Sequence, residues 1–216
     1  MDALIKKDTK WPKNKVIASI PCALKAAAIR LEVAKDEQLF RIGQRPRTMF
    51  YVLSGEMRLT RTSLDGAEII LQRTRCGFLA EASIETSAYH CDAVAFEPVT
   101  ALGFPIAIFL NALEVDVTFR KAWTSNLVQE IRRARARSER LTLKSAAKRV
   151  LHFLESEGQN GVLILDQSRK TWSAELGLTH EALYRTLARL EKEGVISVKD
   201  NTIRLACEMI DYSTIR

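Results

Sequence analysis

The stretch KTWSAELGLTHEALYRTLARLEKEG, residues 170–194, decides the fold because it predicts a short amphipathic helix, a tight turn and a longer amphipathic helix. In the second helix three leucines recur at steps of four and three, which places them on one inward-packing face. They are Leu183, Leu187 and Leu190. The opposite face carries Glu181 and Arg185 near the start of the helix, where a recognition helix in the major groove presents its base-contacting residues. The stretch therefore predicts a helix-turn-helix that binds DNA.

The neighbouring residues favour this interpretation over an ordinary helical hairpin with a solvated outer face. Thr179 can cap the second helix, and Gly177 can adopt the left-handed conformation that the turn needs. Trp172 and Leu176, four residues apart, give the first helix a buried stripe. Each local feature thus agrees with a helix-turn-helix.

A wing is expected after the second helix, which Gly194 ends. The segment 195–205 alternates around Lys199, Asp200 and Asn201, and this predicts two strands joined by a turn at Asp200 and Asn201. Lys199 and, further on, Arg204 would reach phosphate. The domain is therefore expected to be a winged helix-turn-helix.

Two side chains have the chemistry to identify bases. Arg185 offers a planar fork of donors that matches guanine O6 and N7, and Glu181 can accept from the N4 amino group of cytosine. Tyr184 can contact a thymine methyl or a phosphate. The predicted DNA-binding residues are Lys170, Thr179, His180, Glu181, Tyr184, Arg185 and Lys199.

Composition agrees with a DNA-binding protein. The chain has 216 residues, 47% of them hydrophobic, a formal net charge of +7 and a pI near 9.4. A basic protein favours polyanionic partners, because neutralising phosphates releases their counterions. Eight Lys and Arg residues against Glu139 alone lie in residues 131–150, just before the predicted helix-turn-helix.

Other classes of protein are disfavoured. No apolar run approaches the roughly twenty residues that span a bilayer, and the start of the chain lacks the apolar core of a secretory signal, so we expect a cytoplasmic protein with no membrane contact. The cysteines are scattered, which favours free thiols over a zinc or iron-sulfur site. They are Cys22, Cys76, Cys91 and Cys207. No pattern of catalytic residues stands out, so we expect no enzyme and no metal site.

The first half of the chain has short apolar runs broken by turn residues, which predict β-strands. They lie at residues 38–41, 49–53, 57–62, 68–72, 93–96 and 101–104. Asp65-Gly66 between two of them is a strong hairpin signal. Many short strands at regular spacing favour a sandwich or barrel. A helix is expected before them, over residues 16–29.

A long helix is predicted between the two halves, over about residues 107–137. Its apolar positions step by fours and threes, and neither domain can bury such a stripe along its whole length, so the same helix of a second subunit is the expected partner. The expected dimer interface is Phe119, Trp123, Leu127, Ile131 and Ala134. The alternative is a helix lying flat on the β domain. A symmetric dimer would place two recognition helices about 34 Å apart and bind a two-fold operator.

With these parts in this order, the chain resembles the Crp/Fnr superfamily of bacterial transcription regulators. LFRIGQRPRTMFYVLSGEMRLTRTSLDGAEIILQ, GFLAEAS and YHCDAVAFEP resemble the strands and turns of that family's β-roll. LGLTHEALYRTLARLEKEGVI is similar to the family's DNA-reading motif, with Glu181 and Arg185 where the family places its base-reading Glu and Arg.

The resemblance implies a fold and partners. The fold class is α+β, with a cyclic-nucleotide-binding-like β-roll (a double-stranded jelly roll) at residues 1–106, a dimerisation helix at 107–138 and a winged helix-turn-helix at 139–216. The implied partners are double-stranded DNA with TGA-like half-sites, a second copy of the chain and RNA polymerase. His180, where some relatives carry Arg or Pro, leaves the preference at the neighbouring base open.

The signal that the β-roll senses is not determined by the sequence. Where cyclic-AMP-binding relatives have an Arg-Ser pair for the phosphate, this chain has Ser87 and Ala88, and the adenine-binding Thr-Ser pair is replaced by Ala134 and Arg135. An unpaired phosphate in a closed pocket is costly, so a cyclic nucleotide is disfavoured. Glu81, which matches the ribose-binding Glu, is then expected to make a structural hydrogen bond.

Other cofactors are also disfavoured. An iron-sulfur cluster would need several N-terminal cysteines, and Tyr89-His90-Cys91 does not match the positions of the haem ligands in carbon monoxide sensors. A small organic effector, a redox signal at Cys76 or Cys91, and no ligand at all stay open. The candidate effector pocket comprises Glu81, Ser87, Tyr89, His90, Leu127 and Ile131. A haem- or redox-dependent regulator of the same fold, or a cyclic-nucleotide-binding regulatory module, are the alternative functions.

Overall fold

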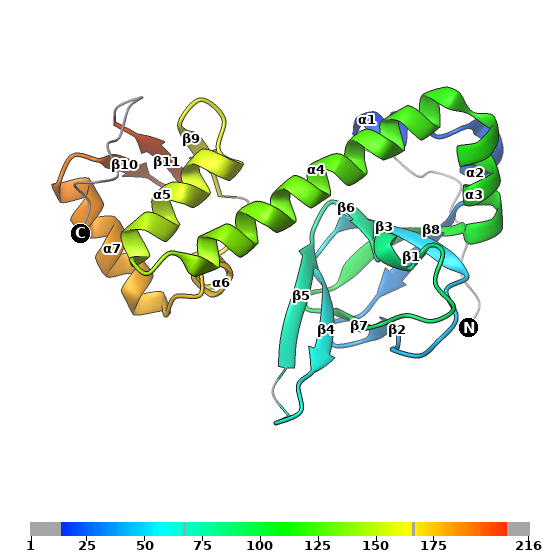
Figure 1. Cartoon of the computed structure of the whole chain (residues 1–216), viewed down its shortest axis with the longest axis horizontal. Coiled ribbons are helices and arrows are strands. Elements are labelled where there is room, and N and C mark those ends of the chain that lie inside the picture. Colours follow the sequence, from blue (N-terminus) through cyan, green and yellow to red (C-terminus); the bar gives the residue numbers. More distant parts are fainter. Residues whose placement is uncertain (1–13, 67, 166, 207–216) are drawn as a thin grey trace. The chain divides into compact units, whose positions relative to one another are not determined.

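The structure is a computed structural model that describes residues 14–66, 68–165 and 167–206. The chain forms two compact units, residues 1–126 and 127–216, and the boundary between them lies within the long helix α4 (Figure 1). Among the residues described, no helix is both long and apolar enough to cross a bilayer.

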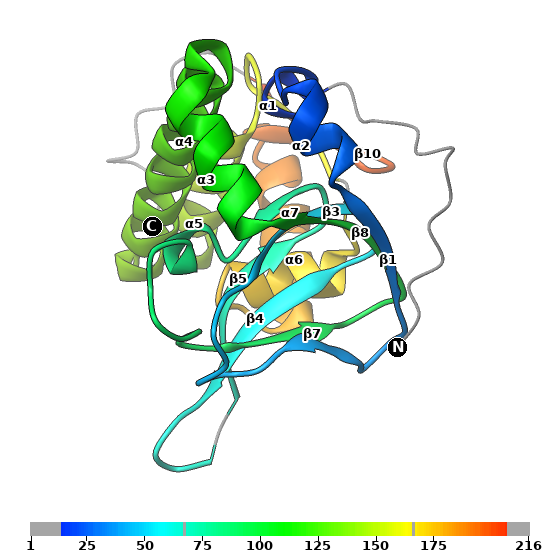
Figure 2. The ribbon, with the colours of Figure 1, turned by 90° about the vertical axis from the view of Figure 1, so that its right-hand side faces the viewer.

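The N-terminal unit is a β-roll of two antiparallel four-stranded sheets, as its short apolar runs predict. One sheet has the order β1-β8-β3-β6 and the other β2-β7-β4-β5. The strands are β1 (Ile29–Val33), β2 (Gln38–Phe40), β3 (Thr48–Ser54), β4 (Met57–Thr62), β5 (Glu68–Thr74), β6 (Gly77–Leu79), β7 (Asp92–Ala95) and β8 (Val99–Pro105). The two sheets face each other, as Figure 2 shows for β3 and β8 above β4 and β7.

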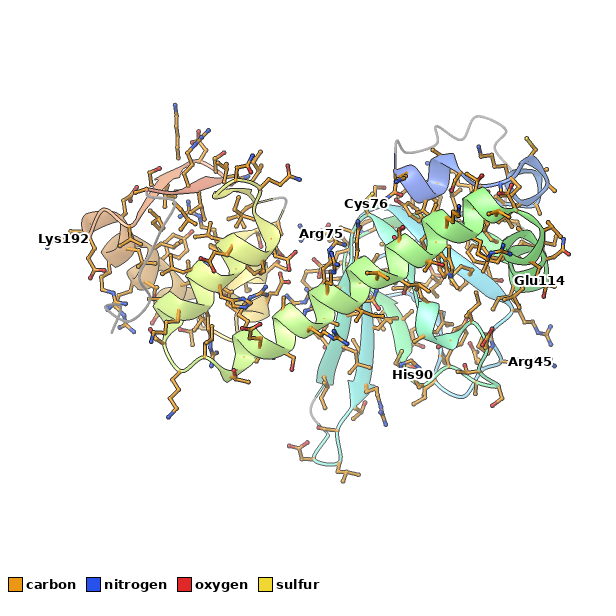
Figure 3. All side chains as sticks on the ribbon, turned by 45° about the horizontal axis from the view of Figure 1, so that its top comes forward. Arg45, Arg75, Cys76, His90, Glu114 and Lys192 are labelled. Atoms are coloured by element: carbon orange, nitrogen blue, oxygen red, sulfur yellow. The ribbon has the colours of Figure 1, made fainter. Side chains whose placement is uncertain are left out.

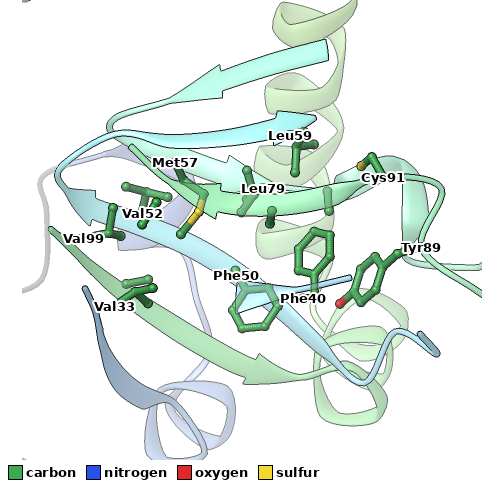
Figure 4. Close-up of a cluster of buried hydrophobic side chains, with 14 residues drawn as sticks. Val33, Phe40, Phe50, Val52, Met57, Leu59, Leu79, Tyr89, Cys91 and Val99 are labelled. Atoms are coloured by element: carbon green, nitrogen blue, oxygen red, sulfur yellow. The ribbon is translucent and has the colours of Figure 1, made fainter. Parts of the chain in front are cut away.

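The core of this unit lies between the two sheets. Alternate residues of facing strands point inward, as the pleat of a strand requires. Phe50 and Val52 come from β3, Met57 and Leu59 from β4, and all four are buried (Figure 4). Phe40, Tyr89 and Cys91 complete the far end of the same cluster (Figure 4). The β-roll is therefore packed with its own side chains.

The single helix expected over residues 16–29 is wrong. The segment holds two short helices, α1 (Lys15–Ala18) and α2 (Cys22–Ala26), and Ile29 begins strand β1, which pairs with β8. Pro21 separates the helices because proline lacks the backbone N–H and clashes with the preceding turn. Strands β1 and β6 were not predicted from the sequence.

The long helix expected over about residues 107–137 is also two helices, α3 (Ile106–Val115) and α4 (Val117–Thr142). The break lies at Asp116, whose backbone is extended, with φ −105° and ψ 104°. Its carboxylate accepts a hydrogen bond from the backbone N–H of Phe119 at 2.8 Å and so caps the start of α4. The capping residue therefore decides where the new helix begins.

The first two positions of the expected dimer stripe are buried within the N-terminal unit itself. Phe119 is fully buried and Trp123 is 5% exposed. The ring of Trp123 meets those of Phe78 and Phe109 edge-on, with centroids 4.8 Å and 5.0 Å apart. Phe119 and Trp123 are thus core residues, and their assignment to a dimer interface is corrected.

The C-terminal unit is a winged helix-turn-helix. It contains the end of α4, then α5 (Ala146–Glu157), β9 (Val162–Ile164), α6 (Arg169–Glu175), α7 (His180–Lys192), β10 (Ile196–Lys199) and β11 (Thr202–Leu205). The strands form an antiparallel sheet of order β10-β11-β9, of which β9 was not predicted. Trp172 and Leu176 of the first helix are fully buried, as their spacing predicts.

Candidate nucleic-acid interface

Helix α7 is held in place by its cap and its leucine face. The side chain of Thr179 accepts a hydrogen bond from the backbone N–H of Ala182 at 3.1 Å, so the predicted N-cap is confirmed. Leu183, Leu187 and Leu190 are buried at 0%, 3% and 0% exposure in the unit's core. The helix therefore has one fixed face inward and one face free for recognition.

The outer face of α7 carries the predicted base-contacting residues together. Glu181 and Arg185 are exposed and one turn apart, and His180 and Tyr184 are exposed beside them. The rings of His180 and Tyr184 meet edge-on with centroids 4.7 Å apart. This face of the helix therefore carries a carboxylate acceptor, a guanidinium fork and two aromatic rings side by side.

The turn before α7 is formed as the sequence predicts. Gly177 has φ +64°, the left-handed conformation that a side chain rarely adopts. Its carbonyl and that of Leu176 accept hydrogen bonds from Arg149 Nη1, both at 3.1 Å. The sequence marked Arg149 only as one of a run of basic residues, and no local pattern indicates its contact with a turn so far along the chain.

The wing is confirmed, with β10 and β11 paired from Ile196 opposite Leu205 to Lys199 opposite Thr202. Asp200 has φ +52° at the turn, and Lys199 beside it is exposed. A contact that sequence reasoning missed fixes the wing tip: Arg169 Nη2 donates to the Asp200 carbonyl at 3.1 Å, and its guanidinium lies 5.3 Å from the Tyr184 ring. The exposed Lys170 follows Arg169 on α6.

The remaining positions of the expected dimer stripe belong to the C-terminal unit and are not buried in it. Ile131 is 52% exposed, Leu127 is half-buried and Ala134 is exposed. Val128, beside them on α4, is 43% exposed. An apolar helical face of this kind is available for another helix.

Four of the residues expected to line an effector pocket, Glu81, Ser87, Tyr89 and His90, lie in the N-terminal unit. Tyr89 is buried, stacked on Phe40 with ring centroids 3.7 Å apart, and its hydroxyl donates to the Thr48 carbonyl at 3.3 Å (Figure 4). Burial raises the pKa of Tyr89 to about 12. Ser87 and His90 are exposed, and Glu81 begins the short helix η1 (Glu81–Ser83). Leu127 and Ile131 belong to the other unit.

The residues present do not fit a bound cyclic nucleotide. Phe40 and Tyr89 stack at one end of the buried cluster between the two sheets (Figure 4), and no guanidinium stands at Ser87 or Ala88 to pair with a buried phosphate. The residues that line a surface hollow of this unit include Phe40 but none of the residues expected to form the effector pocket. The lining residues are Asp36, Glu37, Gln38, Leu39, Phe40, Arg41, Gln44 and Val94.

The residues present do not fit a haem ligand pair either. His90 is exposed with Nδ1 3.4 Å from Ser83 Oγ, whereas the neighbouring Cys91 is fully buried, and burial raises the pKa of its thiol. Among the residues described, no three His, Cys, Asp or Glu side chains are grouped as a metal site would require. Cys76 is exposed and lies apart from His90 (Figure 3), and Cys207 is outside the described residues.

Comparison with known proteins agrees with both units. Residues 30–116 match the family model of the cyclic nucleotide-binding domain, and residues 148–207 match that of the Crp-like helix-turn-helix domain. The chain is 26% identical over 209 residues to the nitrogen fixation regulation protein FixK of Bradyrhizobium diazoefficiens, covering 85% of this chain and 88% of that protein.

Solved structures show the same fold. FixK2 from Bradyrhizobium japonicum superposes with a TM-score of 0.61 at 24% identity, over 84% of this chain and 93% of that one. A mutant of CooA from Carboxydothermus hydrogenoformans superposes with a TM-score of 0.68 at 18% identity, over 92% of this chain and 94% of that one. A β-roll followed by a long helix and a winged helix-turn-helix, matched in both halves, places the chain in the Crp/Fnr superfamily of transcription regulators.

Proposed function

We propose that this regulator acts as a homodimer that binds a two-fold operator whose half-sites contain a TGA element. The observation that carries the proposal is the outer face of α7, where Glu181 and Arg185 are exposed above a fully buried leucine face. Arg185 would donate to guanine O6 and N7, and Glu181 would accept from cytosine N4. Lys170 and Lys199, both exposed, would bind backbone phosphates on either side of the bases that α7 contacts.

The second subunit would meet the exposed apolar face of α4. Leu127, Val128 and Ile131 lie within about one turn of this helix, and burying them against the same residues of a second copy removes apolar surface from water. A two-fold axis there gives an isologous interface. Sedimentation of the purified chain at micromolar concentration should show a dimer, and a monomer that still binds the operator tightly would contradict this part of the proposal.

The signal is proposed to be something other than a cyclic nucleotide, because the stacked rings of Phe40 and Tyr89 are buried within the β-roll and no arginine stands at Ser87 or Ala88 to pair with the phosphate. Among the redox alternatives, burial of Cys91 opposes a role for that thiol, whereas Cys76 is exposed. Calorimetric titration with cyclic AMP and cyclic GMP should show no heat of binding; a saturable signal with either would contradict this assignment.

Binding to designed duplexes tests the operator. A duplex with two inverted TGA half-sites centred one helical turn apart is compared with a scrambled duplex by fluorescence anisotropy at moderate salt. Arg185→Ala should lose about tenfold or more of the discrimination at its G·C pair, since a bidentate contact contributes about 1–3 kcal/mol.

Arg189→Ala is the matched control, because it removes the same charge from an exposed site further along the same helix. It should leave discrimination unchanged. Wild-type protein that binds both duplexes equally would overturn the proposed function.

A further inference from the structure

Three segments of the C-terminal unit meet at the side chain of Arg149, on the first turn of α5. Its Nε donates to the Leu143 carbonyl at 2.7 Å, and its Nη2 lies 3.5 Å from the Leu141 carbonyl. Its Nη1 donates to the carbonyls of Leu176 and Gly177, both at 3.1 Å. One guanidinium thus joins the end of α4 to the turn that precedes α7.

Two of these acceptors, the carbonyls of Leu141 and Leu176, lie at helix ends, and those of Leu143 and Gly177 lie in the connecting segments that follow. The last carbonyls of a helix have no intrahelical donor, and the partial negative charge of a helix C-terminus attracts a cation. Leu141 lies in the last turn of α4, and Leu176 is the C-cap of α6. Arginine suits this position because its planar guanidinium has five donors, whereas a lysine ammonium is a compact point charge.

The turn is packed closely against this guanidinium. A Cβ added at Gly177 would lie 3.0 Å from Arg149 Nη1 and 3.3 Å from Leu141 Cδ2. The turn therefore has little room to shift without moving the Arg149 side chain, and α7 begins three residues after it.

A second arginine fixes the end of α4 to the other end of α5. Arg140 is 1% exposed, its Nη2 donates to Ser156 Oγ at 2.9 Å, and its guanidinium lies 4.3 Å from the centre of the Phe153 ring. The two arginines thus hold the end of α4 against both ends of α5. Of the two, Arg149 also contacts the turn at Gly177 that precedes α7.

We propose that Arg149 is a positioning residue for DNA recognition, which sets the angle of α7 relative to the end of α4 and does not contact phosphate. The inference rests on the proposed function, since a recognition helix must lie at a defined angle to contact base edges. A guanidinium occupied by four carbonyls from two segments has few donors left for DNA.

The test compares wild type, Arg149→Lys and Arg149→Gln on the operator and scrambled duplexes over a range of salt concentrations. Both variants should lower the ratio of operator to scrambled affinity about tenfold, comparable to the loss of one bidentate base contact. The affinity of the Lys variant for scrambled DNA and the salt slope of both variants should equal those of wild type. Lys144→Gln removes an exposed cation from the same basic run and is the control. Its ratio of operator to scrambled affinity should equal that of wild type.

Two results would overturn the proposal. A parallel loss of both affinities in Arg149→Gln, with a salt slope lower by about 0.9, would show a phosphate contact. An unchanged ratio in Arg149→Lys, with only a lower thermal midpoint, would show a role in stability alone. Wild type without operator preference would instead overturn the proposed function, so the two failures are distinguishable.

If Arg149→Lys does not fold at the binding temperature, a variant of the turn that Arg149 contacts keeps the test decisive. Gly177→Ala retains the guanidinium but crowds it, and it should lower the same ratio about tenfold without a change in salt slope. A folded Gly177→Ala protein with the wild-type ratio would contradict the proposal.

Discussion

The rings of Phe78 and Trp123 meet edge-on at an interplanar angle of 89°, with centroids 4.8 Å apart, which fixes the first half of α4 onto strand β6. Trp123→Ala should therefore lower the free energy of unfolding by about 3–5 kcal/mol, as for other large core truncations. Urea unfolding followed by circular dichroism measures this loss.

Val117→Ala is the control on the same helix, since Val117 is 50% exposed, and it should change the free energy by less than about 0.5 kcal/mol. If Trp123→Ala left the stability unchanged and only dissociated the dimer, Trp123 would be an interface residue after all.

The carboxylate of Glu56 is fully buried between two arginines. Arg58 Nε lies 2.6 Å from one of its oxygens, and Arg75 Nη2 lies 2.7 Å from the other. Burial raises the pKa of Glu56, but the hydrogen bonds and charges of Arg58 and Arg75 outweigh it and hold the pKa below its ordinary value. Because the pKa is lowered in the folded state, the stabilisation is present above the ordinary pKa and is lost as the pH falls through the folded value.

Glu56→Gln should cost about 3 kcal/mol at neutral pH, because it leaves two arginines without their anion. It should also flatten the fall in stability that wild type shows below about pH 4.5. Thermal unfolding between acidic and neutral pH measures both effects. Glu85→Gln, at an exposed site, is the control, and an equal acid dependence in wild type and Glu56→Gln would contradict the account.

The described cysteines should differ sharply in reactivity. Cys22 and Cys76 are exposed, whereas Cys91 is fully buried and burial raises its pKa. The thiolate is the reactive form, so native Cys91 should be alkylated by iodoacetamide at least about a hundredfold more slowly than Cys76, through local opening. Peptide mass spectrometry measures the rates, with urea-unfolded protein as the reference. Equal rates for Cys76 and Cys91 in the native protein would show that the β-roll is open.

Two turn glycines of the β-roll allow the free-energy cost of a left-handed backbone to be measured separately from that of a steric clash. Gly55 has φ +82°, and a Cβ there would lie 2.2 Å from the Pro98 carbonyl oxygen and 2.9 Å from Val99 Cα. Gly66 has φ +85°, but its Cβ would meet nothing within 4 Å. Gly66→Ala should cost about 1–2 kcal/mol, the price of a left-handed residue.

Gly55→Ala should cost clearly more, about 3 kcal/mol or above, because backbone must shift as well. Urea midpoints of the two variants give the comparison. Equal losses of unfolding free energy in the two variants would show that the loop before β8 can move to accommodate a methyl group at Gly55 without further cost.

The C-terminal half was predictable because its signals are local. The leucine spacing of α7, the Thr179 cap and the left-handed Gly177 each depend on residues within one or two turns, and the structure has all three. The strands of the β-roll were likewise predictable from apolar runs and turn residues, apart from the short β6 and the first strand.

The errors arose where a distant contact decides the outcome. The apolar stripe on α4 is continuous in sequence, but Phe119 and Trp123 are covered by Phe78 and Phe109, which come from other elements. Asp116 divides the predicted helix because its carboxylate caps the next one. Tyr89 was expected to line an effector pocket, whereas packing against Phe40 makes it a core residue.

By itself, the sequence determined the periodic faces, the caps and the turns, and hence the family, because each of these is set by the conformational preferences of neighbouring residues. Tertiary structure alone decided which apolar side chains are buried within a unit, that Phe40 and Tyr89 stack inside the β-roll, and that Arg149 joins the end of α4 to the Gly177 turn. The physical reason is that burial and multi-donor hydrogen bonding depend on groups far apart along the chain, whose meeting only the folded backbone determines.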